Sequence, residues 1–478
     1  MVLRLFRRSI FSIILLLCLC LALPSVSASP IPLRGVVEGF YGTPWTHAQR
    51  LDMLAFMGRQ GFNAYIYSPK DDQYARAAWR EPYPAAQRRE LGELVRQADQ
   101  AGVQFIYALS PGLDSHFTGP GREADLQAAE AKLESMYALG VRRFAVFFDD
   151  IKNKDAAGQT AFINALSRTL RTRHRDVQTF LTVPVEYYYA DMQQEDVAKP
   201  YTKVFAAQLQ PDIQVLYTGD GVVVPALTQQ ELQRAETLYG RKLGIWWNYP
   251  VTDYLPAKLA LGPIGNLPQR DANAIFFNPM QYPELSKIAL ATGAVYAKEP
   301  EKYEPEQAWR QAIAAQYGDL AEDMALFAGA TQHMENAWAK VGPQDDQVLQ
   351  QAIAQWQAEW PQGGEAAERS RLSLDAQLQR RLTACERLQR ALPQANPEAY
   401  KECEPQLMQW HGLCETARLG LQLLAPEHQG VPVMQRKVQR SQFQNQCRHL
   451  ADEQAHAVIG DTTLVPLLAY INRTLLRI

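Results

Sequence analysis

The stretch RRFAVFFDDIKNKD, residues 142–155, contains the pattern from which the fold is predicted. Its apolar run, residues 144–148, ends abruptly in two adjacent carboxylates, Asp149 and Asp150. A short, continuous apolar run is typical of a strand that is buried on both faces, as in a parallel sheet. Two like charges directly after such a strand allow two interpretations, a helix cap with an ion pair to Lys152 or a pair of catalytic carboxyl groups.

Seven further runs of this kind lie between residues 33 and 298, and stretches of helical periodicity separate them. They are LRGVVEGFYG, FNAYIYSPK, VQFIYALSPG, QTFLTVPVEY, IQVLYTG, LGIWWNYP and NAIFFNPM. Eight strand-then-helix units over about 260 residues are the pattern of a (β/α)8 TIM barrel. The alternative, a doubly wound open sheet, is weaker because no glycine-rich dinucleotide fingerprint follows any strand. We therefore predict an α/β barrel over residues 30–300 and no cofactor.

The remaining chain, residues 301–478, changes to long amphipathic stretches rich in Gln, Glu, Arg and Ala, without strand patterns. This composition predicts an α-helical C-terminal bundle. At the other end, residues 1–28 have the basic start, apolar centre and small-residue cleavage site of a signal peptide. The protein is therefore expected to be exported, to the periplasm or the exterior.

Charge and hydropathy exclude several classes of partner. The chain has 48 basic and 51 acidic residues, and neither a basic stretch for nucleic acid nor a polybasic helix for a membrane surface is evident. No segment after the signal peptide reaches the roughly 18 uninterrupted apolar residues of a membrane span. Nothing in the pattern indicates an oligomeric state.

Polar or turn residues follow the predicted strands at one common end. These are Gly39, Lys70, Asp149, Asp150, Tyr187, Asn248 and Asn278. Strand ends converge on one face of a barrel, where barrel enzymes place their active sites, so a catalytic carboxyl pair is favoured over a cap. No HxH, HExxH or paired-Cys spacing occurs in the barrel, and no metal site is predicted.

Carboxylates with Lys and Asn fit glycoside hydrolysis. Adjacent carboxylates suit a division of roles, with one at the leaving oxygen and the other holding a substituent beside the anomeric carbon. Substrate-assisted hydrolysis of a 2-acetamido sugar requires that division.

Long, ordered motifs resemble glycoside hydrolase family 84, the β-N-acetylglucosaminidases that include the O-GlcNAcases and proteins once labelled hyaluronidases. The motifs are GVVEGFYGTPWTHAQR (35–50), YSPKDDQYARAAWREPYP (67–84), FFDDI (147–151), TVPVEY (182–187), WWNYPVTDY (246–254) and NPMQYPELSKIAL (278–290). The likeness covers about residues 33 to 340. It implies a retaining enzyme that hydrolyses terminal β-linked GlcNAc from a glycan or glycoconjugate through an oxazoline intermediate.

The resemblance also implies a role for each matching residue. Asp149 would orient and polarise the acetamido group, and Asp150 would act as general acid and then general base. The substrate-binding residues would be Tyr187 and Asn248 around the acetamido group, Trp246 as the wall of its pocket, Asp253 at O4 and O6, and Lys70, Asn278 and the Gly39 backbone at the remaining hydroxyl groups.

Two positions depart from the family pattern, Tyr217 where Trp is expected and Asp220 where Pro is common. Two other functions stay open: an endo-acting hyaluronidase or peptidoglycan glycosidase of the same chemistry, and a glycan-binding protein without turnover. Four further carboxylates are interpreted as structural, with Asp71-Asp72 at a turn or a helix start and with Glu38 and Glu186 as buried supports.

Four cysteines remain after signal removal, Cys385, Cys403, Cys414 and Cys447, all in the helical part. An even number in an exported protein favours disulfides, and four cysteines allow three pairings. The helix breakers at 393–398 and 425–432 lie near the midpoints of 385–403 and 414–447. In an antiparallel helical hairpin, the two cysteines of each pair would lie opposite each other on adjacent helices. This predicts the disulfides Cys385–Cys403 and Cys414–Cys447. Buried, reduced cysteines are the alternative.

Overall fold

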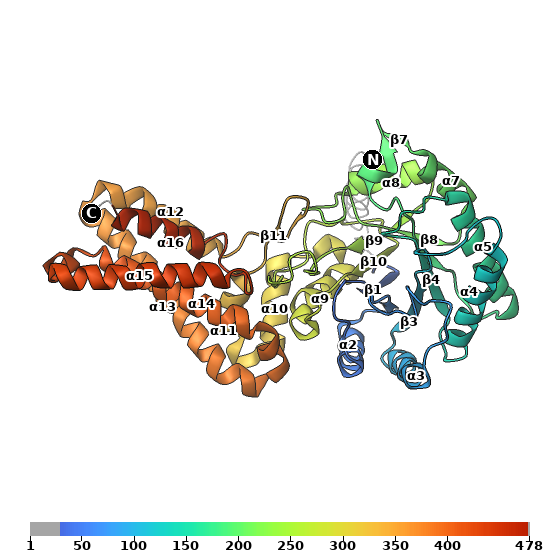
Figure 1. The fold of residues 1–478 in the computed structure, drawn as a ribbon, viewed down its shortest axis with the longest axis horizontal. Coiled ribbons are helices and arrows are strands. Elements are labelled where there is room, and N and C mark those ends of the chain that lie inside the picture. The colour runs from blue at the N-terminus through green and yellow to red at the C-terminus, as the bar shows by residue number, and fades with distance from the viewer. Residues whose placement is uncertain (1–28, 477–478) are drawn as a thin grey trace, which may run out of the picture.

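The computed structural model describes residues 29–476, so the predicted signal peptide lies outside the described residues. Within them, eight parallel strands form a closed barrel in the order β1-β10-β9-β8-β5-β4-β3-β2 (Figure 1). The predicted barrel is confirmed. Its strands are β1 (Leu33–Glu38), β2 (Ala64–Tyr67), β3 (Gln104–Leu109), β4 (Arg143–Phe147), β5 (Leu181–Val183), β8 (Gln214–Tyr217), β9 (Leu243–Trp247) and β10 (Ala274–Phe277).

Pairing of the first strand with the last closes the barrel, with Leu33 opposite Ala274 and Val36 opposite Phe277. Alternate residues of the strands form an apolar cluster inside it, which includes Val37, Phe147 and Trp246. The other faces pack against the helices, so the strands are buried on both sides and read as continuous apolar runs.

Helices cover the outside of the barrel (Figure 1). They are α2 (His47–Gln60), α3 (Ala85–Gln100), α4 (Arg122–Tyr137), α5 (Ala156–Arg173), α6 (Tyr189–Met192), α7 (Pro200–Gln208), α8 (Gln229–Tyr239) and α9 (Pro283–Lys298), with a small hairpin of β6 (Gln193–Gln194) and β7 (Val197–Ala198) after α6.

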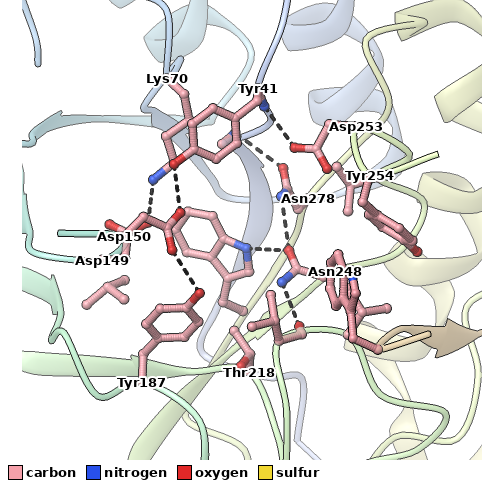
Figure 2. A pocket seen from close by; sticks show the side chains of 17 residues that line it. Tyr41, Lys70, Asp149, Asp150, Tyr187, Thr218, Asn248, Asp253, Tyr254 and Asn278 are labelled. Carbon is pink, nitrogen blue, oxygen red and sulfur yellow. Dashed lines mark hydrogen bonds and ion pairs between the residues drawn. The ribbon is translucent and has the colours of Figure 1, made fainter. Parts of the chain in front are cut away.

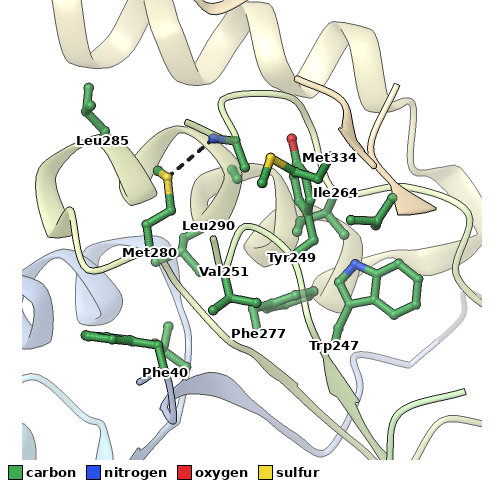
Figure 3. Packing of buried hydrophobic residues seen from close by; sticks show 14 of the residues in the cluster. Phe40, Trp247, Tyr249, Val251, Ile264, Phe277, Met280, Leu285, Leu290 and Met334 are labelled. Carbon is green, nitrogen blue, oxygen red and sulfur yellow. Dashed lines mark hydrogen bonds between the residues drawn. The ribbon is translucent and has the colours of Figure 1, made fainter. Parts of the chain in front are cut away.

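The prediction of a helix after every strand is wrong at one place, because residues 248–273 connect β9 to β10 without one. Prolines recur through this connection, and each removes a backbone donor that a helix would need. Figure 3 shows how the connection packs instead against β9, β10 and α9, with Tyr249, Val251 and Ile264 turned inward. The Tyr249 hydroxyl accepts from Gly262 N at 2.8 Å and donates to Gln332 O at 2.9 Å.

The C-terminal part is helical, as predicted, and extends away from the barrel (Figure 1). It comprises α10 (Pro305–Tyr317), α11 (Ala321–Gly329), α12 (Gln347–Glu359), α13 (Gly364–Ala395), α14 (Pro397–Leu423), α15 (Val433–Glu453) and α16 (Leu464–Leu475), together with a two-stranded turn of β11 (Met334–Glu335) and β12 (Lys340–Val341). No helix among the described residues is both long and apolar enough to cross a membrane.

Buried polar contacts join the barrel to the helical part. The Lys258 ammonium contacts Asp461 at 2.8 Å and Asp345 at 3.4 Å, and Lys258 and Asp345 are both buried. Glu402 of α14 accepts the backbone N–H groups of Glu284 and Leu285 at the start of α9. The two parts are therefore joined by polar contacts, and in the Lys258–Asp345 pair little water is available to replace a lost partner.

The predicted disulfides are absent, since Cys385, Cys403, Cys414 and Cys447 are all free thiols. Helix α13 continues through Pro393 to Ala395, which shifts the turn. The Cys385 thiol consequently lies against the carbonyl of Leu407, about one turn beyond Cys403. Cys414 is fully buried, whereas Cys447 on α15 is half-exposed.

Candidate active site

A cavity of about 520 Å³ opens at the carboxyl ends of the barrel strands, and all nine predicted site residues line it (Figure 2). The predicted lining residues are Gly39, Lys70, Asp149, Asp150, Tyr187, Trp246, Asn248, Asp253 and Asn278. They come from six different strand ends, and only the barrel closure brings them together.

Asp149 is held at the end of β4 with one oxygen paired and the other free. Its Oδ2 forms an ion pair with the Lys70 ammonium, and both side chains are less than 10% exposed. Its Oδ1 is buried and has no hydrogen-bond partner within residues 29–476. An unpaired buried acceptor costs about 1–3 kcal/mol, so this oxygen is ready to accept an N–H group of a ligand.

Asp150 has a left-handed backbone, with φ of 59°. Such a conformation is uncommon for a residue other than glycine and clusters at functional sites. Its two carboxyl oxygens accept from two phenols, Oδ1 from Tyr187 at 3.0 Å and Oδ2 from Tyr41 at 2.7 Å. Burial is the larger cause that raises the pKa of both phenols, and the negative charge of Asp150 is the second. Both hydroxyl groups therefore stay neutral and act as hydrogen-bond donors.

The cap interpretation of the Asp pair is wrong. Helix α5 begins at Ala156, and its cap is Asp155, whose side chain accepts from Gly158 N at 2.9 Å. Asp149 pairs with Lys70 and not with Lys152. The two carboxylates therefore serve the cavity and not the helix.

A hydrogen-bonded chain forms the floor of the cavity next to the Asp pair. The Trp246 indole donates to Asn248 Oδ1 at 2.8 Å, and Asn278 Nδ2 donates to the same oxygen at 3.0 Å. Gly39 N in turn donates to Asn278 Oδ1 at 3.3 Å. A side chain at residue 39 would lie 2.4 Å from the Trp246 ring, so glycine is required for this close approach.

Asp253 lies on the opposite side of the cavity from the Asp pair (Figure 2). Its Oδ2 accepts from Tyr41 N at 2.8 Å, which joins the loop after β1 to the connection after β9. Burial raises the pKa of Asp253 although this backbone N–H donates to it.

The sequence did not single out several lining residues. Tyr41 lies inside a quoted motif, but nothing in its neighbours indicated that its hydroxyl reaches Asp150. Trp338 lies in the turn between β11 and β12, is 57% exposed, and packs on Tyr254 with ring centroids 5.2 Å apart. The remaining unpredicted lining residues are Val183, Thr218, Val222, Val223, Val251 and Tyr254.

The other acidic candidates are structural, as interpreted. Glu38 is fully buried and accepts from Arg50 and from the Tyr65 hydroxyl. Glu186 accepts from Lys154 at 2.9 Å and from the Thr202 hydroxyl at 2.6 Å.

Asp72 accepts from the hydroxyls of Tyr67 and Tyr83, each at 2.7 Å, within the loop that carries Lys70.

Of the two departures from the family pattern, Asp220 pairs with Arg234, and Tyr217 is buried. In residues 29–476, no three His, Cys, Asp or Glu side chains are grouped so as to hold a metal ion.

Comparison with known proteins agrees with this geometry. The sequence model of a family described as beta-N-acetylglucosaminidase matches residues 34–329. The protein O-GlcNAcases of Rattus norvegicus and Mus musculus are each 32% identical over 238 residues, which is 48% of this chain and 26% of each relative. The chain thus matches about a quarter of the length of these curated relatives.

Two solved structures share most of the fold. CpGH84B is 31% identical, with a TM-score of 0.86 over 93% of this chain and 77% of that chain. A mutant of the Thermobaculum terrenum O-GlcNAc hydrolase is 26% identical, with a TM-score of 0.80 over 92% of this chain and 94% of that chain. The likeness therefore includes the helical part as well as the barrel.

Proposed function

The chain belongs to the β-N-acetylglucosaminidase family, glycoside hydrolase family 84, and from this premise we propose that it is a retaining enzyme that removes terminal β-linked GlcNAc by substrate-assisted catalysis. One observation above all supports the proposal. The free, buried Oδ1 of Asp149 lies in the same cavity as Asp150, whose carboxyl group two phenols hold in place.

In the first step the acetamido oxygen of the bound sugar attacks C1 while the glycosidic bond breaks. Asp149 Oδ1 accepts the acetamido N–H, which makes the attacking oxygen more nucleophilic and stabilises the positive charge that develops on the oxazoline ring. Asp150 donates its proton to the leaving oxygen. Because Lys70 occupies only Oδ2 of Asp149, Oδ1 stays available for this contact.

In the second step water attacks C1 and reopens the oxazoline. Asp150 now accepts the proton of that water, and Asp149 again supports the acetamido N–H. Two inversions at C1 leave its configuration unchanged, as in other retaining glycosidases. The Trp246 ring and Asn248 would enclose the acetyl group, since they form the cavity floor beside the Asp pair.

Action at a chain end is supported by the bond between Tyr41 N and Asp253 Oδ2. It closes the side of the cavity where Asp253 would hold O4 and O6. A sugar whose O4 meets a carboxylate there cannot carry a further sugar on that oxygen. The proposed substrate is therefore a GlcNAc unit at a non-reducing end.

The roles of the two carboxylates are tested with aryl substrates of different leaving groups. Asp150→Ala should slow hydrolysis of a phenyl glycoside by about 10²–10⁴-fold but largely spare a dinitrophenyl glycoside, which needs little protonation. Asp149→Ala should impair both. Asp71→Ala, an exposed aspartate of the neighbouring loop, serves as control and should leave both rates unchanged. Equal leaving-group dependence in the two variants would refute these roles.

A thiazoline that mimics the cyclised acetamido sugar gives a second test. It should inhibit the wild type tightly and should bind Asp149→Ala far more weakly, because Asp149 supports the cyclised form. Equal affinity for both proteins would contradict substrate assistance.

Product analysis separates the remaining alternatives. Release of single GlcNAc from the non-reducing end of defined oligosaccharides, followed by mass, supports the proposal. Internal cleavage would instead indicate an endo-acting hyaluronidase or peptidoglycan glycosidase. Binding without any product would indicate a glycan-binding protein.

We also propose export to the periplasm or the exterior, which rests only on the pattern of residues 1–28. The mature protein should then begin at Ser29. Mass spectrometry of the protein from its native host tests this, and an intact N-terminus would overturn it.

A further inference from the structure

The far end of the helical part contains a second cavity, of about 490 Å³. Its apolar lining includes Trp360, Leu423 and Leu475, and its polar lining consists of His428, Arg436 and Arg440. The chain after α15 contacts the barrel through Lys258. Helix α15 has 21 residues, so its first turn lies about 30 Å from that contact.

Basic side chains are concentrated at this end of the helical part. No carboxylate is among the described side chains of the cavity, and residues 433–451 contain no Asp or Glu. Arg436 Nε is buried and has no hydrogen-bond partner among the side chains and backbone that the structure describes. Burial, and after it the charges of Arg436 and Arg440, lower the pKa of His428.

Large apolar side chains are exposed on the same two turns of α15. Val433 is 59% exposed, Met434 75% and Val438 53%. Met434 and Val438 are four residues apart and share one face of the helix, and Lys437 lies between them in the sequence. Basic and apolar side chains therefore occur together on the first two turns of α15, and a surface that offers both anionic head groups and an apolar layer matches both kinds of side chain.

We propose that the first two turns of α15 and the adjoining cavity dock on a bilayer surface that contains anionic phospholipids. Arg436, Lys437 and Arg440 would pair with lipid phosphates, while Met434 and Val438 would enter the acyl boundary. Charge patterning along the sequence does not indicate such a surface, because the cavity and the apolar exposure exist only in the folded chain.

Charge complementarity favours a membrane over the other occupants. A second copy of this chain docked through the same patch would place Arg436, Lys437 and Arg440 against their own equivalents, which repel. A small free anion would need the arginines but not the exposed Val433, Met434 and Val438. The formal net charge of the whole chain is −3, so attraction to an anionic surface requires a local patch of this kind.

Figure 1 shows the helical part extending away from the barrel. Docking through its far end would leave the catalytic cavity accessible. The proposal is independent of the proposed function, because it concerns residues that do not touch that cavity.

Vesicle co-sedimentation tests the proposal with the full chain. Wild type should bind phosphatidylcholine vesicles that contain 30% phosphatidylglycerol and should not bind pure phosphatidylcholine. Each cation near an anionic surface contributes about fivefold to partitioning, so R436Q/K437Q/R440Q should lower binding by on the order of 100-fold. M434S/V438S should lower it as well, and activity on a soluble aryl substrate should be unchanged in both variants, which verifies folding.

The matched control R88Q/R89Q/R96Q removes the same charge from exposed positions of α3 on the barrel and should bind vesicles like wild type. Equal loss of binding in this control would overturn the proposal in favour of unspecific attraction. Absence of binding to the anionic vesicles would overturn it outright. Full binding by M434S/V438S, with competition by millimolar inorganic phosphate, would reassign the site to a free anion.

Discussion

Replacing Gly39 by alanine should strongly lower the proposed hydrolytic activity without unfolding the chain. The added Cβ would lie 2.4 Å from Cζ2 of Trp246, and ordinary contact begins at 3.4 Å, so the ring must move by about 1 Å. The Trp246 indole donates to Asn248 Oδ1 at 2.8 Å. A displacement of that size breaks the bond, because it moves the donor beyond hydrogen-bond distance.

The magnitude follows from this displacement. A misplacement of 1 Å in a positioning group costs about 10²-fold in rate, which corresponds to about 2.7 kcal/mol of transition-state stabilisation. Overpacking of the barrel interior should also lower the free energy of unfolding by about 1–3 kcal/mol. We therefore expect kcat/KM on an aryl β-N-acetylglucosaminide to fall about 100-fold, with a lower Tm but intact secondary structure.

Two further variants identify the cause. Gly265→Ala adds the same methyl group to the connection after β9 where nothing lies within 4 Å, and it should behave like wild type. Trp246→Phe removes the two ring atoms that the new Cβ would meet. Gly39→Ala should therefore cost much less in the Trp246→Phe background, a coupling of at least about 1 kcal/mol. Gly39→Ala activity within threefold of wild type, or additive effects of the two changes, would refute the reasoning.

Three other predictions concern charged groups. Burial raises the pKa of Glu402 to about 8. The contribution of this protonated carboxyl group to stability is complete below the unfolded pKa near 4.3 and is lost as the pH rises towards 8. Denaturant titrations should therefore show the free energy of unfolding falling by up to about 4 kcal/mol over that range, and Glu402→Gln should abolish this pH dependence. Lys258→Met removes the cation from the buried Asp345, which keeps only neutral hydrogen-bond donors, and should lower the free energy of unfolding by about 3–5 kcal/mol. K258M/D345N should recover part of the lost Tm, and no recovery would contradict the pairing. Arg76 donates to the Tyr41 hydroxyl at 3.3 Å, and Tyr41 donates to the proposed general acid, so Arg76→Gln should lower kcat several-fold on poor leaving groups; a change in KM alone would argue against this role.

The sequence by itself determined the barrel and the composition of its site. Strands buried on both faces read as apolar runs, and each run ended in polar residues at its carboxyl end, so the convergence of Lys70, Asp149 and Asn248 followed from the fold class. The long motifs then identified Trp246 and Asp253, which periodicity could not have singled out. The apolar runs, their polar ends and the long motifs can be predicted from sequence because each lies within a short segment or repeats along the chain.

Only the tertiary structure decided the contacts between segments far apart in the sequence. Trp338 reaches the cavity from a turn beyond the barrel, and Tyr41 reaches Asp150 across 109 positions. The cysteine pairing failed because a proline near a predicted turn did not end its helix: α13 continues to Ala395 and places Cys385 beside Leu407. A shift of a few residues in a helical hairpin rotates and translates every side chain on it, and packing, not local sequence, sets that register.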